Sequence, residues 1–381
     1  MFLRRFFAVV LCVLLLLPTC FIETFALSED EISSPSAILI EPDSKKILFE
    51  KNSDEQRACA SITKVMTLLL VMEAIEQGKI SYDDVVTTSE HAKSMGGSDI
   101  WLEVGEQMTV DEMIKATAVA SANDAAVALA EHLCGTEDEF VALMNQRAKE
   151  LSMENTVFKN CNGLDEEGHI TSAHDVAVMS AELIKHEKIF DYTTIWLDTL
   201  RGGETQIVNT NKLLKSYDGI TGLKTGTTGD AGSCISATAT RNGMSLVAVV
   251  LGATTGTDRF KDAAVLLDYG FANYEVLGFE ADSKDIKDIK VNGGMKKSVK
   301  IKCEGSSNIV VEKGSKDKLV RNVKLKESLD APVKKGMKVG EVTFALNEKE
   351  VSSFDVVTSD FVDEITFSSV FLELINAMIA M

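Results

Sequence analysis

The stretch Ala60-Ser61-Ile62-Thr63-Lys64-Val65-Met66-Thr67 opens a segment in which apolar residues recur at helical spacing. The spacing continues to Gln77 and Gly78 then supplies a terminator, so the pattern predicts a helix with Ser61 at or near its N-terminus. Residues three apart on a helix share a face, and the Lys64 amine can therefore reach the Ser61 hydroxyl. An S-x-x-K tetrapeptide on its own usually marks only a helix start, with the serine as cap.

A serine hydroxyl is a weak nucleophile until a neighbouring base takes its proton, and Lys64 is the candidate base. Burial and nearby cations both lower the pKa of an amine, and Lys224 is a candidate for such a cation. The helix N-terminus would add positive potential and a free backbone N–H beside Ser61, which suits a developing oxyanion. This arrangement predicts covalent catalysis through Ser61.

Two further motifs follow in order, Ser121-Ala122-Asn123 and Lys224-Thr225-Gly226. Thr109 and Glu112 form a capping box before a helix predicted to run to about residue 119, and residues 124–134 predict another helix that ends at Gly135. The second motif therefore falls at the junction of two helices. Helical patterns over 139–151 and 175–186 extend this region into a helical subdomain.

Strand patterns flank the helical region on both sides. Residues 36–40 and 46–49 are short apolar runs around a polar turn, which predicts an N-terminal hairpin. Residues 233–240 and 245–251 flank Asn242-Gly243, and Asn-Gly between apolar runs is a strong hairpin signal. The third motif lies just before this second hairpin.

The composition changes after Phe279. Residues 281–290 are polar, and short alternating segments such as 298–303, 309–312 and 341–346 predict a small β domain. Helical spacing then returns, with one apolar face formed by Phe367, Val370, Phe371, Leu374, Ile375, Met378 and Ile379. The expected organisation is a catalytic domain over 27–275, a β-rich domain over 280–360 and an amphipathic helix over 361–381.

The N-terminus has the order of a secretory signal: Arg4 and Arg5, an apolar run over 6–18, and small and polar residues up to Ala26. We expect residues 1–26 to be a signal peptide that is cleaved after Ala26, and the protein to be exported. The apolar run is shorter than the ~20 residues that span a bilayer, which argues against a retained anchor. A lipoprotein signal at Cys20 is disfavoured by the Pro18-Thr19 that precedes it.

Size and charge restrict the function. The 381 residues exceed the usual size of one hydrophobic core. The net charge of −19 argues against nucleic-acid binding, which needs a clustered excess of Lys and Arg. No zinc-protease, P-loop or G-x-S-x-G motif occurs, and His169 and His174 have no clear ligand partners, so we expect no metal and no cofactor. The mature cysteines show no C-x-x-C spacing and are expected to be mostly buried hydrophobes: Cys59, Cys134, Cys161, Cys234 and Cys303.

Besides the three motifs, the sequence contains two further segments typical of one enzyme family, Asn162-Gly163-Leu164-Asp165 and Gly168-His169. From about residue 36 to the terminal helix the chain resembles low-molecular-weight penicillin-binding proteins, the serine-type D-alanyl-D-alanine carboxypeptidases. The resemblance implies an α/β (α+β) catalytic domain of the β-lactamase/transpeptidase type, with an antiparallel sheet and a helical subdomain, followed by a small C-terminal β domain. It also implies a hydrolase that removes the terminal D-Ala from peptidoglycan stem pentapeptides through an acyl-enzyme on Ser61, the residue that penicillin would acylate.

The resemblance also implies roles for individual residues. Lys64 is the base, the backbone N–H groups of Ser61 and Thr227 form the oxyanion hole, and Arg259 fits the position of an arginine that binds the substrate's terminal carboxylate. A guanidinium suits a planar carboxylate because it donates two parallel hydrogen bonds, although a surface arginine is the alternative. The catalytic set is Ser61, Lys64, Ser121 and Asn123, and the substrate-binding set is Lys224, Thr225, Gly226, Thr227 and Arg259.

Three other functions are possible for a chain with these motifs: a β-lactamase, a non-catalytic wall-binding module and a D,D-endopeptidase. A β-lactamase adds a carboxylate base, but Glu166 and Glu167 lack the Asn four residues later that its pattern requires. A non-catalytic wall-binding module would tolerate loss of Ser61 or Lys64, and both are present. Residues 227–230 lack a His that some relatives have after the third motif, so the pH dependence of those relatives does not predict that of this chain. A D,D-endopeptidase uses identical chemistry and stays open, with Arg259 as the one distinguishing residue.

The terminal helix gives an expectation about location. Relatives use such a helix as an anchor, and we expect this enzyme at the outer face of the cytoplasmic membrane. The apolar face is too short to span a bilayer and would lie in the interface. No Lys or Arg follows Lys349, while Glu364 and Glu373 are acidic, so the sequence predicts attachment by apolar burial alone. The alternative is a helix packed on the protein or in a dimer.

Overall fold

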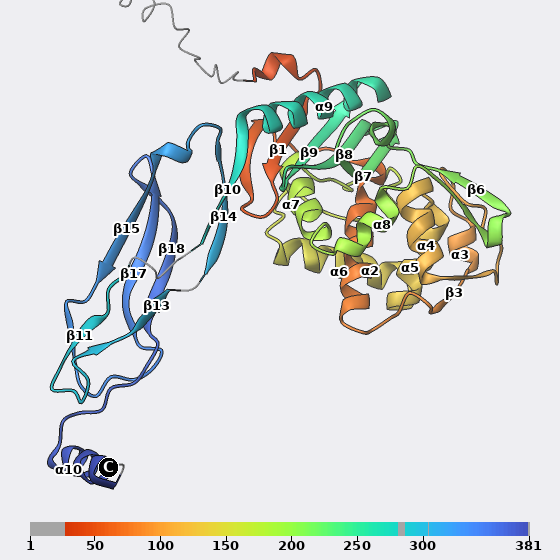
Figure 1. The fold of residues 1–381 in the computed structure, drawn as a ribbon. Helices are drawn as coiled ribbons and strands as arrows, with labels where there is room; N and C mark the ends of the chain where they lie inside the picture. The colour runs from red at the N-terminus through yellow and green to blue at the C-terminus, as the bar shows by residue number, and fades with distance from the viewer. Residues whose placement is uncertain (1–26, 281–285, 304, 380–381) are drawn as a thin grey trace, which may run out of the picture.

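The structure is a computed structural model that describes residues 27–280, 286–303 and 305–379 (Figure 1). The expected signal peptide and its cleavage site after Ala26 lie outside the described residues. The described chain begins with a short 3-10 turn, η1 (Glu29–Glu31), which leads into the first strand.

A five-stranded antiparallel sheet forms the centre of the N-terminal region. Its strand order is β2 (Lys46–Lys51), β1 (Ser36–Glu41), β9 (Met244–Ala253), β8 (Gly232–Arg241) and β7 (Ile220–Thr228). Both predicted hairpins are therefore confirmed, and the first lies beside the second. Asn242 and Gly243 connect β8 to β9 with positive φ angles of 51° and 76°, as a two-residue hairpin turn requires.

Each face of this sheet packs against helices. Along β1, Ile38 and Ile40 face the core formed with α2 (Lys64–Glu76) and its neighbours. Ala37 and Leu39 face the other core, which α9 (Gly256–Asn273) covers. This alternation follows from the two-residue period of a strand. The sheet is thus the middle layer between two sets of helices, and α2 lies in the larger set.

Helix α2 is more deeply buried than its sequence pattern predicts. The apolar spacing indicates one buried face, whereas every residue from Lys64 to Met72 is buried. The helix is enclosed by the helical subdomain, which holds the main helices α4 (Val110–Lys115), α5 (Asn123–Cys134), α6 (Glu137–Glu150) and α7 (Ala173–Leu183). Shorter elements connect them: α3 (Glu90–Lys93), α8 (Phe190–Thr193), η4 (Glu187–Ile189), η5 (Arg201–Gly203), η6 (Lys212–Lys215), and the strand pairs β3 (Val85–Thr87) with β4 (Gln107–Thr109) and β5 (Leu197–Leu200) with β6 (Thr205–Val208).

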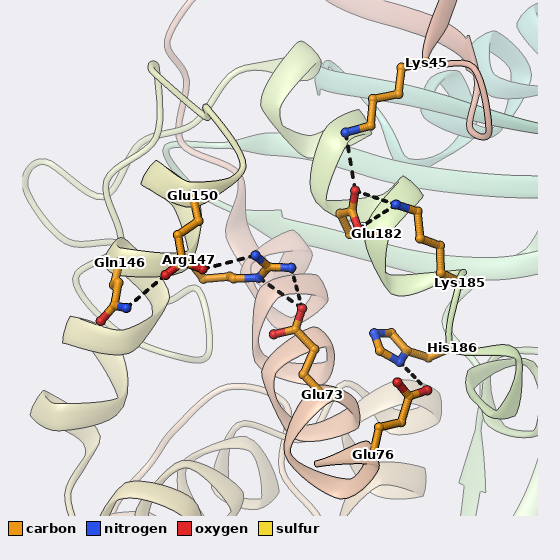
Figure 2. Close-up of polar contacts among 9 residues, drawn as sticks. All are labelled: Lys45, Glu73, Glu76, Gln146, Arg147, Glu150, Glu182, Lys185 and His186. Carbon is orange, nitrogen blue, oxygen red and sulfur yellow. Dashed lines mark hydrogen bonds and ion pairs between the residues drawn. The ribbon is translucent and has the colours of Figure 1, made fainter. Parts of the chain in front are cut away.

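Ion pairs tie the C-terminal end of α2 to α6 and to the segment after α7 (Figure 2). Arg147 of α6 lies 2.7 Å from Glu73 and 3.1 Å from Glu150. His186 Nδ1 lies 2.7 Å from Glu76 Oε1, without the alignment of a hydrogen bond. These pairs are partly exposed, so each contributes little on its own. Together they fix the position of the helix end that is remote from Ser61.

The C-terminal region is built from β strands, as predicted. Strand β10 (Tyr274–Glu280) continues from α9 and pairs with β14 (Ser306–Glu312). Two sheets follow. The first has the order β12 (Ser298–Val299), β11 (Ile289–Asn292) and β16 (Ser328–Asp330), and the second has the order β13 (Ile301–Cys303), β18 (Lys349–Thr358), β17 (Lys338–Leu346) and β15 (Leu319–Leu325). The turn η7 (Lys316–Lys318) comes directly before β15. These sheets enclose their own apolar core, which includes Val342 and Val356.

The chain ends in helix α10 (Phe367–Ile379), at the end of the β region that points away from the five-stranded sheet (Figure 1). None of the helices in the described ranges is both long and apolar enough to cross a membrane. The five cysteines after residue 26 are unpaired, and four of them are buried: Cys59, Cys161, Cys234 and Cys303. The expectation that most of them pack as small hydrophobic residues is confirmed.

Candidate active site

The first motif lies where a 3-10 turn, η2 (Ala60–Thr63), runs into α2. Ser61 is half-buried on the turn, and Lys64 is fully buried as the first residue of the helix. Lys64 Nζ lies 3.0 Å from Ser61 Oγ, 2.5 Å from Asn123 Oδ1 and 2.6 Å from the Asn162 carbonyl oxygen. The spacing of the tetrapeptide therefore brings the amine to the hydroxyl, as predicted.

The environment of Lys64 favours the neutral amine. Burial lowers its pKa to about 7, although the carboxylates of Asp99 and Asp124 oppose the shift. A neutral amine has two N–H donors and one lone pair. Asn123 Oδ1 and the Asn162 carbonyl can accept both N–H groups, which leaves the lone pair facing Ser61 Oγ. This geometry suits an amine that accepts the serine proton.

The second motif follows an irregular helix. Helix α4 begins with the predicted capping box between Thr109 and Glu112, but a π turn, η3 (Ala116–Ala120), interrupts it before the motif. Ser121 then adopts a left-handed conformation with φ of 62°, and Asn123 opens α5. Such π turns occur often at functional sites. Here the turn releases Ser121 from the helix, and the sequence pattern had predicted only a junction.

The third motif lies on β7, an outer strand of the sheet. Lys224 is buried, and its Nζ donates to Ser121 Oγ at 2.8 Å and to the Thr225 carbonyl at 2.9 Å. Thr225 Oγ1 donates to Thr210 Oγ1 at 2.7 Å. At Gly226 an added Cβ would lie 2.8 Å from the backbone nitrogen of Ser61. Only glycine therefore lets β7 approach the nucleophile this closely, and Thr227 beside it is exposed.

The two buried lysines are close enough for their charges to interact, but burial is the largest cause of the lowered pKa of Lys64. The expected role of Lys224 as a neighbouring cation is therefore secondary to burial. The pKa of Lys224 is itself held well below its ordinary value, first by burial and then by the positive charges of Lys64 and Arg259. Both amines are thus able to exchange protons with the hydroxyls they contact.

Arg259 lies beside the third motif, on the first turn of α9. Its Nη1 donates to Thr227 Oγ1 and to the Gly226 carbonyl, each at 2.7 Å. Its Nε is buried and has no hydrogen-bond partner among the described residues. The Nη1 contact places the guanidinium beside the exposed Thr227, where a guanidinium is a suitable partner for an anionic group of a substrate.

His169 and Gly163 support the turn that carries Ser61, a role that no sequence pattern predicts. His169 Nδ1 accepts from the Lys159 N–H at 3.2 Å, which assigns the ring proton to Nε2, 2.8 Å from Thr63 Oγ1. Thr63 Oγ1 in turn donates to the carbonyl of Ala60, which has a φ of 50°. Burial lowers the pKa of His169 to about 4 and keeps the ring neutral.

Gly163 packs directly against the carbonyl group of Ala60. An added Cβ would lie 2.0 Å from that oxygen, so no larger residue fits there without displacing the turn. The segments Asn162–Gly163 and Gly168-His169 carried the family resemblance in the sequence, but their contacts join residues about a hundred positions apart. Across the described ranges, no group of His, Cys, Asp and Glu side chains is arranged to hold a metal ion.

The chain was compared with known proteins. A family model described as D-alanyl-D-alanine carboxypeptidase matches residues 23–255, and one described as penicillin-binding protein 5, C-terminal domain, matches residues 278–364. The chain is 45% identical to D-alanyl-D-alanine carboxypeptidase DacF of Bacillus subtilis over 317 residues, which cover 82% of each chain.

Solved structures agree with this match. Penicillin-binding protein 5 from Haemophilus influenzae is 32% identical, with a TM-score of 0.75, over 89% of this chain and 100% of that one. Penicillin-binding protein D2 from Listeria monocytogenes in its ampicillin-bound form is 32% identical, with a TM-score of 0.58, over 63% of this chain and 98% of that one.

Proposed function

The chain belongs to the D-alanyl-D-alanine carboxypeptidase family, and we propose that its reaction proceeds through Ser61 with Lys64 as the base. It is a serine-type carboxypeptidase of the cell wall and has the mixed α/β fold of the penicillin-binding proteins, with the β domain that follows it. One observation supports the residue assignment above all. The buried Lys64 amine contacts Ser61 Oγ while two carbonyl oxygens are placed to accept its N–H groups.

In the acylation step, Ser61 Oγ attacks the carbonyl carbon of the penultimate D-Ala, and its proton passes to Lys64 Nζ. The backbone N–H groups of Ser61 and Thr227 stabilise the negative charge on the carbonyl oxygen. The bond to the terminal D-Ala then breaks, and its nitrogen takes up a proton relayed through Ser121, which Lys224 contacts. The proton that Lys64 received from Ser61 thus leaves the site with D-Ala, and Lys64 is neutral again. The product is an ester on Ser61 and free D-Ala.

In the deacylation step, a water molecule attacks the ester carbonyl and gives a proton to the neutral Lys64. Lys64 passes this proton to Ser61 Oγ as the ester bond breaks, which releases the shortened peptide and restores Ser61. A β-lactam would acylate Ser61 in the same way, and its ester would persist if water attacks it slowly. Glu166 and Glu167 are exposed, and within the described residues neither bonds to Ser61 or Lys64. Neither glutamate is therefore placed as the carboxylate base that a β-lactamase uses.

We further propose that the substrate ends in a free carboxylate, which distinguishes carboxypeptidase from endopeptidase action. Digestion of purified peptidoglycan followed by mass analysis tests this. We expect pentapeptide stems to lose one alanine while cross-links stay intact. Cleavage of cross-links with pentapeptides unchanged would instead identify a D,D-endopeptidase.

Replacing Arg259 tests the carboxylate contact directly. In Arg259→Ala we expect kcat/KM for peptides ending in a free D-Ala to fall about 10- to 100-fold relative to amidated analogues, from the ~1.5–3 kcal/mol of a hydrogen bond to a charged group. Arg259→Lys keeps the charge but loses the paired donors, so its kcat/KM for these peptides should lie between the wild-type value and that of Arg259→Ala. Equal losses on both substrates would mean that Arg259 only supports Gly226 and Thr227.

We also propose that the protein is exported and held at a membrane surface through α10. The helix exposes large apolar side chains, with Phe367 at 87% exposure and both Met378 and Ile379 above 75%. Residues 362–365, by contrast, pair with the β region through Val333, Gly293 and Gly294. The predicted apolar face is thus exposed in large part, although the side chain of Leu374 lies outside the described part.

Truncation after Thr366 tests this attachment while keeping the β-region contacts. We expect the mature chain from Leu27 to bind phospholipid vesicles, and the truncated chain to remain in solution with unchanged acylation by penicillin, because the apolar area is lost but the catalytic site is intact. A Phe371→Asp variant of the full mature chain should behave like the truncated one. Equal vesicle binding by the truncated and full chains would show that α10 packs on protein instead.

A further inference from the structure

A group of lysines lies beside the segment that leads into α10, although no Lys or Arg lies in that helix. We propose that this group, Lys296, Lys297, Lys300, Lys334 and Lys335, binds the headgroups of anionic phospholipids when α10 lies in the bilayer interface. We call these five residues the lysine collar. The inference rests on the proposed membrane attachment and names the kind of surface to which the enzyme attaches.

Backbone hydrogen bonds fix the collar next to the start of α10. The Met295 N–H donates to the Asp363 carbonyl and the Ile365 N–H to the Gly293 carbonyl, each at 2.8 Å. Val333 and Val362 exchange two hydrogen bonds at 2.8 and 2.9 Å. The loop before β12 and the loop after β16 are therefore both held against the segment that leads into the helix.

Apolar and basic groups share one surface at this end. A groove of about 390 Å³ is lined by Lys296, Phe361, Ser369 and Leu372 among others, and Lys296 Nζ lies 5.9 Å from the centre of the Phe361 ring. Phe361 and Leu372 are both 58% exposed. Ammonium groups beside exposed apolar side chains suit the boundary between lipid headgroups and acyl chains.

The charge distribution supports an anionic partner. Residues 286–366 contain 16 Lys and Arg against 13 Asp and Glu, in a chain whose net charge is −19. All five collar lysines are exposed. Acidic residues lie close by, at Asp288, Asp360, Asp363 and Glu364, but among the described residues only Lys296 of the collar forms an ion pair, with Asp360 at 3.4 Å. The other four ammonium groups are available to lipid phosphates.

This inference differs from the expectation of attachment by apolar burial alone. That expectation considered only the residues adjacent to the helix in sequence, all of which are neutral or acidic after Lys349. The fold brings lysines to the helix from positions about thirty and seventy residues earlier. Each Lys near an anionic surface contributes about 1 kcal/mol, and salt screens the contribution.

The test uses the mature chain from Leu27 with its C-terminus intact, and vesicles of phosphatidylcholine with or without phosphatidylglycerol. We expect the phosphatidylglycerol vesicles to bind it at least about tenfold more tightly at about 0.1 M salt, and this preference to vanish near 1 M salt. Lys297→Glu/Lys335→Glu should abolish the preference and leave binding to pure phosphatidylcholine unchanged.

The matched control, Lys316→Glu/Lys318→Glu, makes the same change of charge at η7, at the opposite end of the β region (Figure 1). It should keep the preference, and normal acylation by penicillin would show that every variant is folded. Equal binding of the wild-type chain to both vesicles, or equal losses in the two double variants, would overturn the role of the collar. If the chain truncated after Thr366 binds as well as the full chain, the attachment through α10 fails instead.

Discussion

Ser61→Ala should abolish both covalent labelling by penicillin and release of D-Ala. In the described structure Ser61 is the hydroxyl that contacts the neutral Lys64 amine, and a serine peptidase that loses its nucleophile typically loses about 10⁶-fold in kcat. The measurement is mass spectrometry of the protein after incubation with penicillin, together with D-Ala release from a pentapeptide. The melting temperature should stay close to that of the wild-type chain, because the side chain is only half-buried.

Ser121→Ala is the matched control, since Ser121 also contacts a buried lysine. That variant should still be labelled on Ser61, at a reduced rate, because it lacks only a proton relay. Undiminished labelling of Ser61→Ala, or a label on Ser121 in the wild-type chain, would place the nucleophile elsewhere.

Lys64→Met should lower the rate of acylation by about 10²- to 10⁴-fold, the usual contribution of a general base. Methionine has a similar length and no charge, so it fills the buried position without leaving a cavity. We expect the fold to persist, as circular dichroism and thermal unfolding would show. A near-normal acylation rate in this variant would assign the base to another group, with Lys224 as the first candidate.

The pH profile gives a second measure of the same role. The pKa of Lys64 is lowered to about 7, so the neutral, reactive form increases as pH rises through 7 and decreases below it. At pH 7 an amine with the ordinary pKa would be neutral in only about one molecule in three thousand. Acylation of the wild-type chain should therefore rise from pH 5 to a plateau above about pH 7, and Lys64→Met should lose this dependence. A wild-type profile that rises only above pH 9 would contradict the shift.

Local signals in the sequence predicted much of the fold and the site. The capping box at Thr109 and the Asn242-Gly243 hairpin depend on neighbours within four residues, and both are present. The three motifs also meet, because Lys64 contacts both Ser61 and Asn123 while Lys224 contacts Ser121.

The features that were not predicted depend on contacts between distant parts of the chain. The bond between His169 and Thr63 spans 106 positions, and no periodic pattern encodes it. The full burial of α2 depends on the helices that enclose it, which its own sequence does not reveal. The π turn before Ser121 was not predicted because no residue pattern in that segment indicates one. The gathering of the five lysines beside the segment before α10 was not predicted for the same reason, since they come from distant positions in the sequence.

The pairing of β1 with β9, the central strand of the main sheet, constrains how the chain can acquire activity. In this pairing Ser36 of β1 lies opposite Leu251 of β9, and Ile40 lies opposite Val247. The sheet can therefore form only when nearly the whole N-terminal region is present. Such non-local pairings raise the contact order and slow folding, because a long loop must close before its contacts repay the lost entropy. A chain that ends before β9 therefore has no assembled nucleophile, and the enzyme becomes reactive only after β9 has been synthesised and has paired with β1.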